Sequence, residues 1–288
     1  MKIFNVVPAV TGRYDGRRVR LRMRQRIVTG VSGGSVFLVL LWVGHWWYAG
    51  FISALATISY IEFCSMKGIR FSRPQALIGL CLMWLLLLTG MADQQMIGPG
   101  WFLDSPDNIL AGMILFLVFM VLSRNRLQVD EAAYLFLGSL YIGYGFSYMI
   151  QARMIVDGFI WSLLALVVTW VNDTGAYFTG KRWGKRKLWP SVSPNKTVEG
   201  SLGGIFLSVL VSGLFGLLYP ELGVFSTVLF IGFLVSVVGQ VGDLVESALK
   251  RTTGVKDSGS LLPGHGGILD RFDSLLLVFP VLYLIQLI

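Results

Sequence analysis

The chain has 288 residues, of which 55% are hydrophobic and only 14% are charged. Soluble domains carry roughly 25% charged residues, so this composition excludes an ordinary soluble enzyme. The net charge is +8, but residues 1–26 alone contribute +7, which leaves a nearly neutral remainder. A basic arm directly before an apolar segment indicates attachment to anionic lipid headgroups, and no nucleic-acid partner is expected.

Nine apolar segments follow this basic arm, each bounded by charged residues or by Gly and Pro clusters. Apolar segments of about 20 residues are long enough to cross a bilayer as helices. We expect helices over residues 27–48, 50–66, 74–92, 108–123, 132–150, 158–180, 200–219, 223–247 and 273–288. The sequence therefore predicts an all-α, polytopic integral membrane protein with about nine transmembrane helices, in which residues 27–288 form a single transmembrane domain.

The basic residues test this arrangement, because Lys and Arg concentrate in cytoplasmic loops. With nine crossings, 23 of the 24 basic residues fall on one side of the membrane, and only Arg153 falls on the other. We therefore expect a protein integral to the cytoplasmic (inner) membrane, with a cytoplasmic N terminus and an external C terminus. The loops over residues 181–196 and 250–271 are expected to be cytoplasmic, and the loop over residues 93–107 external.

Cysteine and histidine are scarce in this chain. The two cysteines, Cys64 and Cys81, lie in successive apolar segments and are too few for a disulfide framework or a thiolate metal site. Two histidines, His45 and His265, cannot form a His-rich zinc site. A metal ion would have to be held mainly by oxygen, which points to magnesium or a similar hard cation.

Acidic residues gather at the predicted cytoplasmic ends of the later helices. An ionisable residue at membrane depth costs about 2.5–3.5 kcal/mol on insertion scales, so its position indicates a function. Asp173 lies near the end of the sixth predicted helix, Asp243 and Glu246 near the end of the eighth, and Asp270 and Asp273 at the start of the ninth. Residues three apart share a helix face, so each of the two pairs could present two carboxylates to one cation.

Basic residues lie on the same predicted side of the membrane. They are Lys181, Arg182, Lys185, Arg186, Lys187, Lys196, Lys250, Arg251, Lys256 and Arg271. Carboxylates for a hard cation beside fixed positive charge fit a site for a polyphosphate. For any single lysine, however, positive-inside bias with ion pairing is the better explanation. Glu62, on the second predicted helix, has no polar neighbours in the sequence and is interpreted as a helix-packing or lysine-pairing residue.

The most specific signal is the segment over residues 247–273, which reads S-A-L-K-R-T-T-G-V-K-D-S-G-S-L-L-P-G-H-G-G-I-L-D-R-F-D. This segment resembles, without a gap, the C-terminal signature of the phosphatidate cytidylyltransferases, the CDP-diacylglycerol synthases. Residues 173–177 (D-T-G-A-Y), Gly180, Gly184, Lys185 and residues 193–200 (S-P-N-K-T-V-E-G) are also similar to that family. The resemblance covers about residues 170–288, the expected catalytic part, whereas the arm and the N-terminal half carry no recognised motif.

The resemblance implies that CTP and phosphatidate are converted to CDP-diacylglycerol and pyrophosphate by attack of a lipid phosphate oxygen on the α-phosphorus of CTP. A phosphomonoester is already largely dianionic near neutral pH, because its second pKa is about 6. A general base is therefore dispensable, and a covalent serine is not expected. The difficulty lies in bringing two polyanions together, which calls for positioning, magnesium and basic side chains. A second metal or a monovalent cation could join magnesium.

Chemistry and resemblance together assign roles to individual residues. The leading metal ligands are Asp243, Asp270 and Asp273, with Asp173 as a fourth candidate. The expected contacts to triphosphate or to leaving pyrophosphate are Lys196, Lys250 and Arg251. The expected contact to the lipid phosphate is Lys256 or Arg271. The three aspartates other than Asp173 and the three triphosphate-binding residues make up the predicted catalytic set.

Neutral polar residues add further candidates for nucleotide binding. Ser193, Asn195 and Thr197 could contact the nucleotide, or they could cap the seventh predicted helix. His265 lies in a glycine-rich stretch, where a hydrogen bond to phosphate and a structural role in a turn are equally supported. Glu199 could pair with Lys196, and no chemistry is assigned to it.

Two other classes of protein stay open on this evidence. A CTP-dependent kinase of lipid alcohols would share the polytopic body but would release CDP, and a transporter would place its acidic residues near the bilayer midplane. Gly200 and Gly204 are four residues apart, a spacing that favours close helix packing over a headgroup-binding loop. Such small-residue faces also make a homodimer possible.

Overall fold

The computed structural model describes residues 16–94, 96–97, 107–124, 126–261 and 266–287, with side chains from residue 28 onward. The α-helices are α1 (Gly16–Val43), α2 (His45–Met66), α3 (Pro74–Asp93), α4 (Asp107–Leu122), α5 (Val129–Met154), α6 (Gly158–Trp183), α7 (Val198–Leu218), α8 (Phe225–Thr253), α9 (Leu269–Phe272) and α10 (Leu275–Leu284). A 3-10 helix η1 (Pro220–Leu222) precedes α8. Strands β1 (Lys187–Trp189) and β2 (Ser193–Thr197) pair antiparallel, so the predicted all-α fold includes one small hairpin.

Six of the described helices are long and apolar enough to cross a membrane, namely α2, α3, α5, α6, α7 and α8. The expected nine are not confirmed, because three apolar helical segments are shorter: Val28–Val43 within α1, α4 and α10. The ten residues of α10 rise only about 15 Å, half of a hydrocarbon core that is about 30 Å thick. Six spanning helices are therefore supported by length and composition among the described residues, and the total of nine stays a prediction.

Several helices extend beyond their predicted ends. Helix α1 begins at Gly16 and runs through the predicted boundary between the arm and the transmembrane domain. Helix α8 continues to Thr253 and carries Lys250 and Arg251 in its last turn. Basic side chains in a last turn interact favourably with the negative end of the helix dipole, so the charges that were taken to end a helix are part of it. The ninth predicted helix, over residues 273–288, is shorter in the structure: α10 covers Leu275–Leu284, and the separate short helix α9 precedes it.

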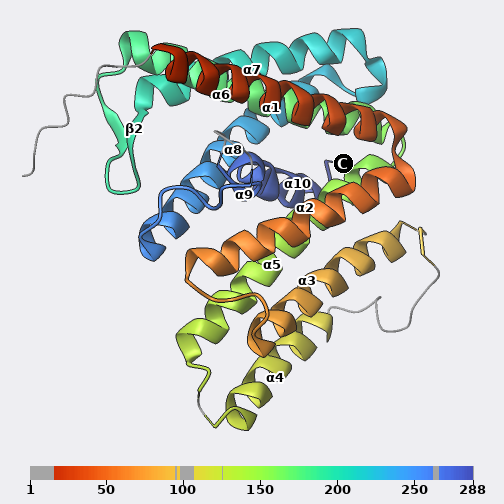
Figure 1. The fold of residues 1–288 in the computed structure, drawn as a ribbon. Coiled ribbons are helices and arrows are strands. Elements are labelled where there is room, and N and C mark those ends of the chain that lie inside the picture. Colours follow the sequence, from red (N-terminus) through yellow and green to blue (C-terminus); the bar gives the residue numbers. More distant parts are fainter. Residues whose placement is uncertain (1–15, 95, 98–106, 125, 262–265, 288) are drawn as a thin grey trace, which may run out of the picture.

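The helices form two groups that meet at the C-terminal segments (Figure 1). Helices α6, α7 and α8 pack against one another, while α5 packs against α2 and α3. Helix α10 lies between these groups and contacts both α5 and α8. The N-terminal group therefore supports the segment that follows α8.

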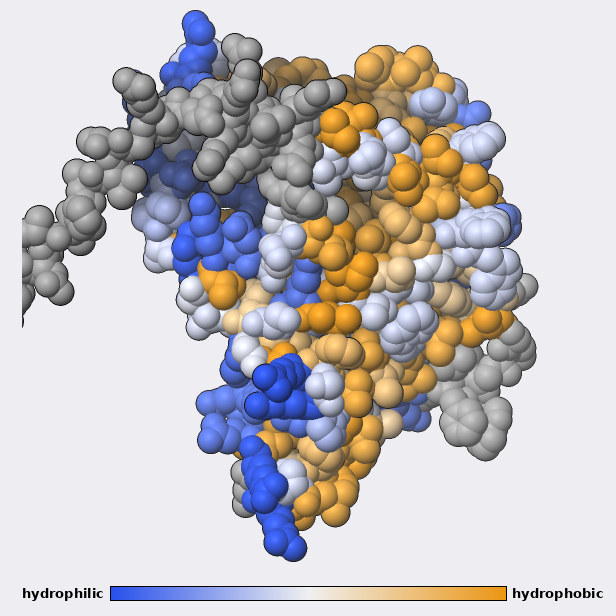
Figure 2. Space-filling view, in the orientation of Figure 1, coloured by the Kyte–Doolittle hydropathy of each residue, from blue (hydrophilic) through white to orange (hydrophobic). Residues whose placement is uncertain are grey.

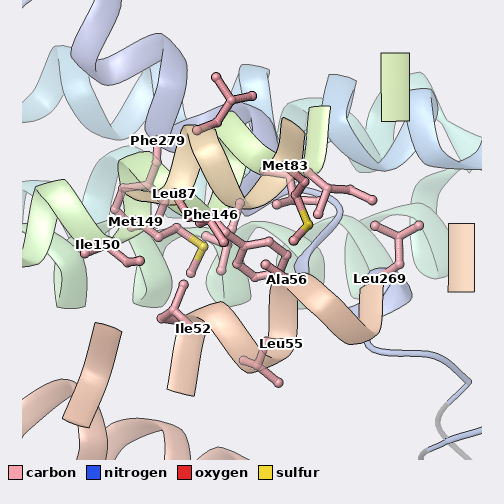
Figure 3. Packing of buried hydrophobic residues seen from close by; sticks show 14 of the residues in the cluster. Ile52, Leu55, Ala56, Met83, Leu87, Phe146, Met149, Ile150, Leu269 and Phe279 are labelled. Atoms are coloured by element: carbon pink, nitrogen blue, oxygen red, sulfur yellow. The ribbon is translucent and has the colours of Figure 1, made fainter. Parts of the chain in front are cut away.

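The buried core joins elements from both halves of the sequence, as Figure 3 shows. Ala56 of α2, Leu87 of α3 and Phe146 of α5 pack with Leu269 of α9 and Phe279 of α10, and all of them are almost fully buried. Between membrane helices the attraction comes mainly from close van der Waals packing, since lipid is as apolar as the side chains. This packing fixes α9 and α10 in place.

The outer surface separates by polarity. Figure 2 shows hydrophobic residues over most of the visible face and hydrophilic residues along its left edge, where Figure 1 places the β1–β2 hairpin and the C-terminal end of α8. Large exposed apolar side chains on α7 include Leu202, Phe206, Leu210 and Leu214. An apolar body with one polar edge is the surface expected of a protein embedded in a bilayer.

The glycines at 200 and 204 pack helix against helix, as their spacing favoured. A Cβ atom at Gly204 would lie 2.6 Å from Asn172 Oδ1 and 2.8 Å from the Asn172 carbonyl oxygen of α6. At Gly200 a Cβ atom would lie 2.7 Å from the carbonyl oxygen of Ala176. Only glycine allows α6 and α7 to approach this closely.

We predict that Gly204→Ala destabilises the protein by about 1–3 kcal/mol, because the added methyl group must push α7 away from α6. The measurement is thermal unfolding in detergent. The control is Gly50→Ala on α2, where an added Cβ meets no atom within 4 Å. That variant should keep or slightly raise the melting temperature, and equal melting temperatures for the two variants would contradict the close packing of α6 and α7.

Candidate active site

A cleft of about 450 Å³ lies between α6, α7, α8 and the hairpin. Its charged and polar lining includes Asp173, Lys181, Asn195, Lys196, Thr197 and Asp243. All six were named from the sequence: five of them as site candidates, and Lys181 only in the wider set of basic residues. The fold therefore brings together, at the polar edge of the molecule, candidates that are up to 70 positions apart in the chain.

The hairpin is attached to α7 by two side chains at its base. Thr197 is the N-cap of α7, and its Oγ1 accepts a hydrogen bond of 3.1 Å from the Gly200 N–H. Glu199 accepts hydrogen bonds from the backbone N–H groups of Lys185 at 3.0 Å and Arg186 at 3.2 Å. Thr197 thus has the capping role considered for it, whereas Glu199 holds backbone N–H groups at the start of the hairpin in place of the suggested pairing with Lys196.

An ion pair crosses the cleft between the hairpin and α8. The Lys196 ammonium of β2 contacts the Asp243 carboxylate, and both side chains are partly exposed. Ser247 Oγ, one turn further along α8, donates to Asp243 Oδ1 at 3.3 Å. A basic and an acidic group thus meet on an accessible surface, where an anionic ligand or a cation can compete for either of them.

An uncharged network forms the base of the cleft. Asn172 Oδ1 accepts hydrogen bonds from Ser236 Oγ at 2.6 Å and from Gln240 Nε2 at 2.8 Å. Gln240 also contacts Ser201 through the side chain and donates to its carbonyl oxygen at 3.2 Å. These residues were not predicted from the sequence, because the prediction relied on charged side chains. An amide side chain inside an apolar helix is the signal that could have identified Asn172 and Gln240.

A second polar cluster is buried where α8 meets α9. Lys250 Nζ lies 2.6 Å from Glu246 Oε2 and 2.7 Å from Asp270 Oδ1. Asp270 Oδ2 accepts hydrogen bonds from the backbone N–H groups of Ser258 at 3.0 Å and Gly267 at 2.8 Å. Burial alone would raise the pKa of Asp270, but its interactions with Glu246 and Lys250 and the Gly267 N–H lower it to about 2. Asp270 is therefore a fixed anion within this cluster.

Asp273 is in a different electrostatic environment from Asp270. Burial raises its pKa to about 7, and the nearby carboxylates of Asp243 and Asp173 add to the increase. The Ser274 N–H donates to Asp273 Oδ1 at 2.7 Å. Asp173, Asp243 and Asp273 therefore repel one another across the space between α6, α8 and α9.

The donor chemistry of these three aspartates fits a hard cation such as magnesium, because oxygen is its preferred ligand and a cation would relieve their repulsion. Within the described ranges, no group of three or more His, Cys, Asp or Glu side chains is arranged to hold a metal ion. Asp270 and Asp273, expected to share one cation, contact different partners. The chemistry of the site fits the ion, but its ligands are not gathered around one point.

The other predicted residues lie apart from the cleft. Arg251 Nε donates to the Val192 carbonyl oxygen at 3.3 Å, and Lys256 is exposed on the segment after α8. Arg271 lines an apolar groove between α1, α2, α6 and α9. Ser193, at the start of β2, is half-buried. His265 lies outside the described residues.

The interpretation of Glu62 needs correction. Its carboxylate, on α2, accepts hydrogen bonds from Ser258 Oγ at 3.3 Å and from the backbone N–H groups of Ile268 at 3.1 Å and Leu269 at 3.0 Å. Glu62 is therefore not simply a packing residue, and its hydrogen-bond partners here are a serine and two backbone N–H groups, not a lysine. Its polar neighbours are about 200 positions away in the chain, so the local sequence could not reveal them.

Fold and site together define a helical membrane protein with a cleft at its polar edge that is lined by both basic and acidic side chains. The sequence model of the Cytidylyltransferase family matches residues 24–288. The chain is 44% identical over 262 residues to the phosphatidate cytidylyltransferase of Bacillus subtilis (strain 168), covering 91% of this chain and 96% of that protein. It is 39% identical over 261 residues to the protein of the same name from Staphylococcus aureus (strain COL), covering 90% and 97%. The chain belongs to the cytidylyltransferase family.

The family match confirms the resemblance and extends it. The recognised motifs covered about residues 170–288, whereas the match begins at residue 24 and includes the N-terminal half. Helices α2, α3 and α5 therefore belong to the family fold although no catalytic motif was recognised in them. Their packing gives a physical reason: α2 contacts α9, α5 contacts α10, and α3 packs on α5, so the three helices support the signature segment over residues 247–273.

We predict that Lys250→Met lowers the stability of the protein by about 3–5 kcal/mol, because it leaves the carboxylates of Glu246 and Asp270 buried without their shared ammonium. Thermal unfolding in detergent measures the loss. Lys256→Met, at an exposed position, is the control and should leave the melting temperature unchanged. An equally small effect at both lysines would rule out a stabilising role for the buried cluster.

Proposed function

We propose that this chain transfers the cytidylyl group of CTP to phosphatidate, giving CDP-diacylglycerol and pyrophosphate. The observation that carries the proposal is the match to relatives named phosphatidate cytidylyltransferase over nine-tenths of the chain, at 44% and 39% identity. The cleft supports it, because the cleft places a lysine and carboxylates at the polar edge of an apolar body. A water-soluble nucleotide and a lipid substrate can meet at such an edge.

The residues of the cleft act mainly by positioning charge. Lys196 binds a phosphate oxygen of CTP, exchanging its contact with Asp243 for the substrate, and Asn195 contributes a neutral hydrogen bond beside it. The lipid phosphate attacks as a dianion, so no side chain has to remove a proton from it. Basic side chains stabilise the pyrophosphate as it leaves, which is the electrostatic contribution that such reactions require. Arg251 is the candidate for this contact, because Lys250 is already held by Glu246 and Asp270, and Lys256 or Arg271 is the candidate for the lipid phosphate.

We assign a magnesium site to Asp173, Asp243 and Asp273, with Asp270 as a further candidate. The mutual repulsion of the first three carboxylates supports this choice. Asp270 already contacts Lys250 and accepts hydrogen bonds from two backbone N–H groups, which favours a structural role over metal binding. Magnesium, when bound, neutralises part of the triphosphate charge. A second metal or a monovalent cation could bind beside it.

The nucleotide products distinguish this reaction from its two rivals. Purified protein is incubated with magnesium, phosphatidate and CTP labelled either at the α or at the γ phosphate. Cytidylyl transfer puts the α label into lipid and the γ label into pyrophosphate. A lipid-alcohol kinase given its alcohol would instead put the γ label into lipid and release CDP, and a transporter would leave CTP intact. Either of those results would refute the proposal.

The same assay tests the metal ligands when it is run against magnesium concentration. Asp273→Asn should lose activity by orders of magnitude and need more magnesium for half-maximal rate, with partial rescue by manganese. If Asp270 is also a ligand, Asp270→Asn should shift the magnesium curve in the same way. If it only holds Lys250 and the loop, Asp270→Asn should lower the melting temperature and leave the magnesium curve in place.

We further propose that the N terminus and the cleft face the cytoplasm and that the C terminus faces outward. In the nine-crossing arrangement, 23 of the 24 basic residues lie on the side of the N terminus and the cleft, and the odd number of crossings puts the C terminus on the other side. A homodimer formed through exposed apolar helix faces is compatible with the same surface.

Cysteine labelling of intact cells tests the orientation in a variant whose Cys64 and Cys81 are replaced by alanine. Ser260→Cys, exposed on the segment after α8, should react only after the membrane is made permeable. Val156→Cys, 86% exposed in the turn between α5 and α6, should react with a membrane-impermeant reagent from outside. The reverse pattern would overturn the orientation.

A further inference from the structure

Glu62 is a buried carboxylate in the half of the chain that carries no catalytic motif. It lies on α2, only 7% of its surface is exposed, and among the described residues it accepts hydrogen bonds from the segment between α8 and α9 and from the start of α9. A buried carboxylate is costly unless its oxygens are hydrogen-bonded, so a position of this kind needs a compensating role.

Both carboxylate oxygens of Glu62 accept hydrogen bonds from the signature segment over residues 247–273. Oε1 accepts the Ile268 N–H at 3.1 Å, while Oε2 accepts the Leu269 N–H at 3.0 Å and the Ser258 hydroxyl at 3.3 Å. The carboxylate thus joins the two ends of the segment over residues 258–269. Backbone N–H groups bound to a carboxylate form charge-assisted hydrogen bonds, which are stronger than neutral ones.

Two glycines of the signature segment make room for this carboxylate. A Cβ atom at Gly259 would collide with Glu62 Oε1, and a Cβ atom at Gly267 would collide with both Ser258 Oγ and Glu62 Oε2. Neither glycine has the positive φ that would by itself require glycine. The absence of a side chain is therefore explained by the Glu62 carboxylate, together with the Ser258 hydroxyl at Gly267, and not by the backbone conformation.

Glu62 and Asp270 hold the same segment from opposite sides. The backbone N–H of Ser258 binds Asp270, and the hydroxyl of the same residue binds Glu62. Gly267 donates to Asp270 and its neighbour Ile268 donates to Glu62. Asp270 in turn contacts Lys250, so the position of the segment is linked to that of the basic group on α8.

We propose that Glu62 is a positioning residue for cytidylyl transfer. By binding Ser258 at one end of the segment and Ile268 and Leu269 at the other, it keeps Asp270 and Lys250 in the positions that the reaction needs. It touches no substrate and acts through the backbone it binds. The inference rests on the proposed function, so the turnover of the unmodified protein is measured first. Absence of turnover there would count against the proposed function, and only a result on the Glu62 variants bears on this role.

The test is Glu62→Gln, assayed as kcat and as KM for CTP and phosphatidate per folded molecule. Glutamine has one acceptor oxygen, and its amide nitrogen would face a backbone N–H that needs an acceptor. We expect kcat to fall at least tenfold with both KM values within about threefold, because the lost alignment matters most as charge moves to pyrophosphate. Glu131→Gln is the matched control, since Glu131 contacts Arg73 and Gln75 away from the cleft, and it should keep the kcat of the unmodified protein.

Gly259→Ala disturbs the same contact at the glycine, and it replaces Glu62→Gln as the test if that variant does not fold. It adds one methyl group against Glu62 and should also lower kcat. Because both changes disturb one contact, the double variant should lose no more than the more damaged single variant. A kcat within threefold of the unmodified protein in folded Glu62→Gln or Gly259→Ala, whatever the melting temperature, would overturn the proposal. So would a loss in the double variant equal to the product of the two single losses.

Discussion

The C-terminal half of the structure depends on one buried ammonium group. Lys250 lies between Glu246, which is 1% exposed, and Asp270. In surroundings of low dielectric constant an unpaired charge costs several kcal/mol, so the three side chains have to stay together once they are buried. Since Lys250 and Glu246 belong to α8 and Asp270 to α9, this requirement joins the two helices more specifically than apolar packing could.

The N-terminal half of the chain supports this cluster through contacts with α9. Phe146 of α5 packs against Phe272 of α9 with the ring centroids 5.5 Å apart, and Glu62 of α2 binds the backbone at the start of the same helix. Apolar packing and hydrogen bonding thus act on one short element. A family match that begins at residue 24 is consistent with a scaffold that cannot be separated from the signature it supports.

The cleft and the buried cluster use the same chemical groups for different purposes. Lys196 and Asp243 meet where solvent and ligands can reach them, whereas Lys250 and Asp270 are largely enclosed. An accessible ion pair contributes little to stability, so exchanging it for a bound polyanion costs little. An enclosed pair is expensive to break, which suits it to hold a backbone segment in place. Burial, and not residue type, therefore separates binding from support among these lysines and aspartates.

Apolar length, basic loops and the segment over residues 247–273 are local signals, so the membrane class, the position of most helices and the family could be predicted without a structure. The same signals indicated Asp173, Lys196 and Asp243, which the fold brings to one cleft. Long-range packing, in contrast, encloses Asp270 beside Lys250 and places Asn172 and Gln240 at the base of the cleft. Glu62 shows the reason most clearly. Its partners are about 200 positions away, so no local pattern encodes a contact that exists only after α2 has packed beside the segment that follows α8.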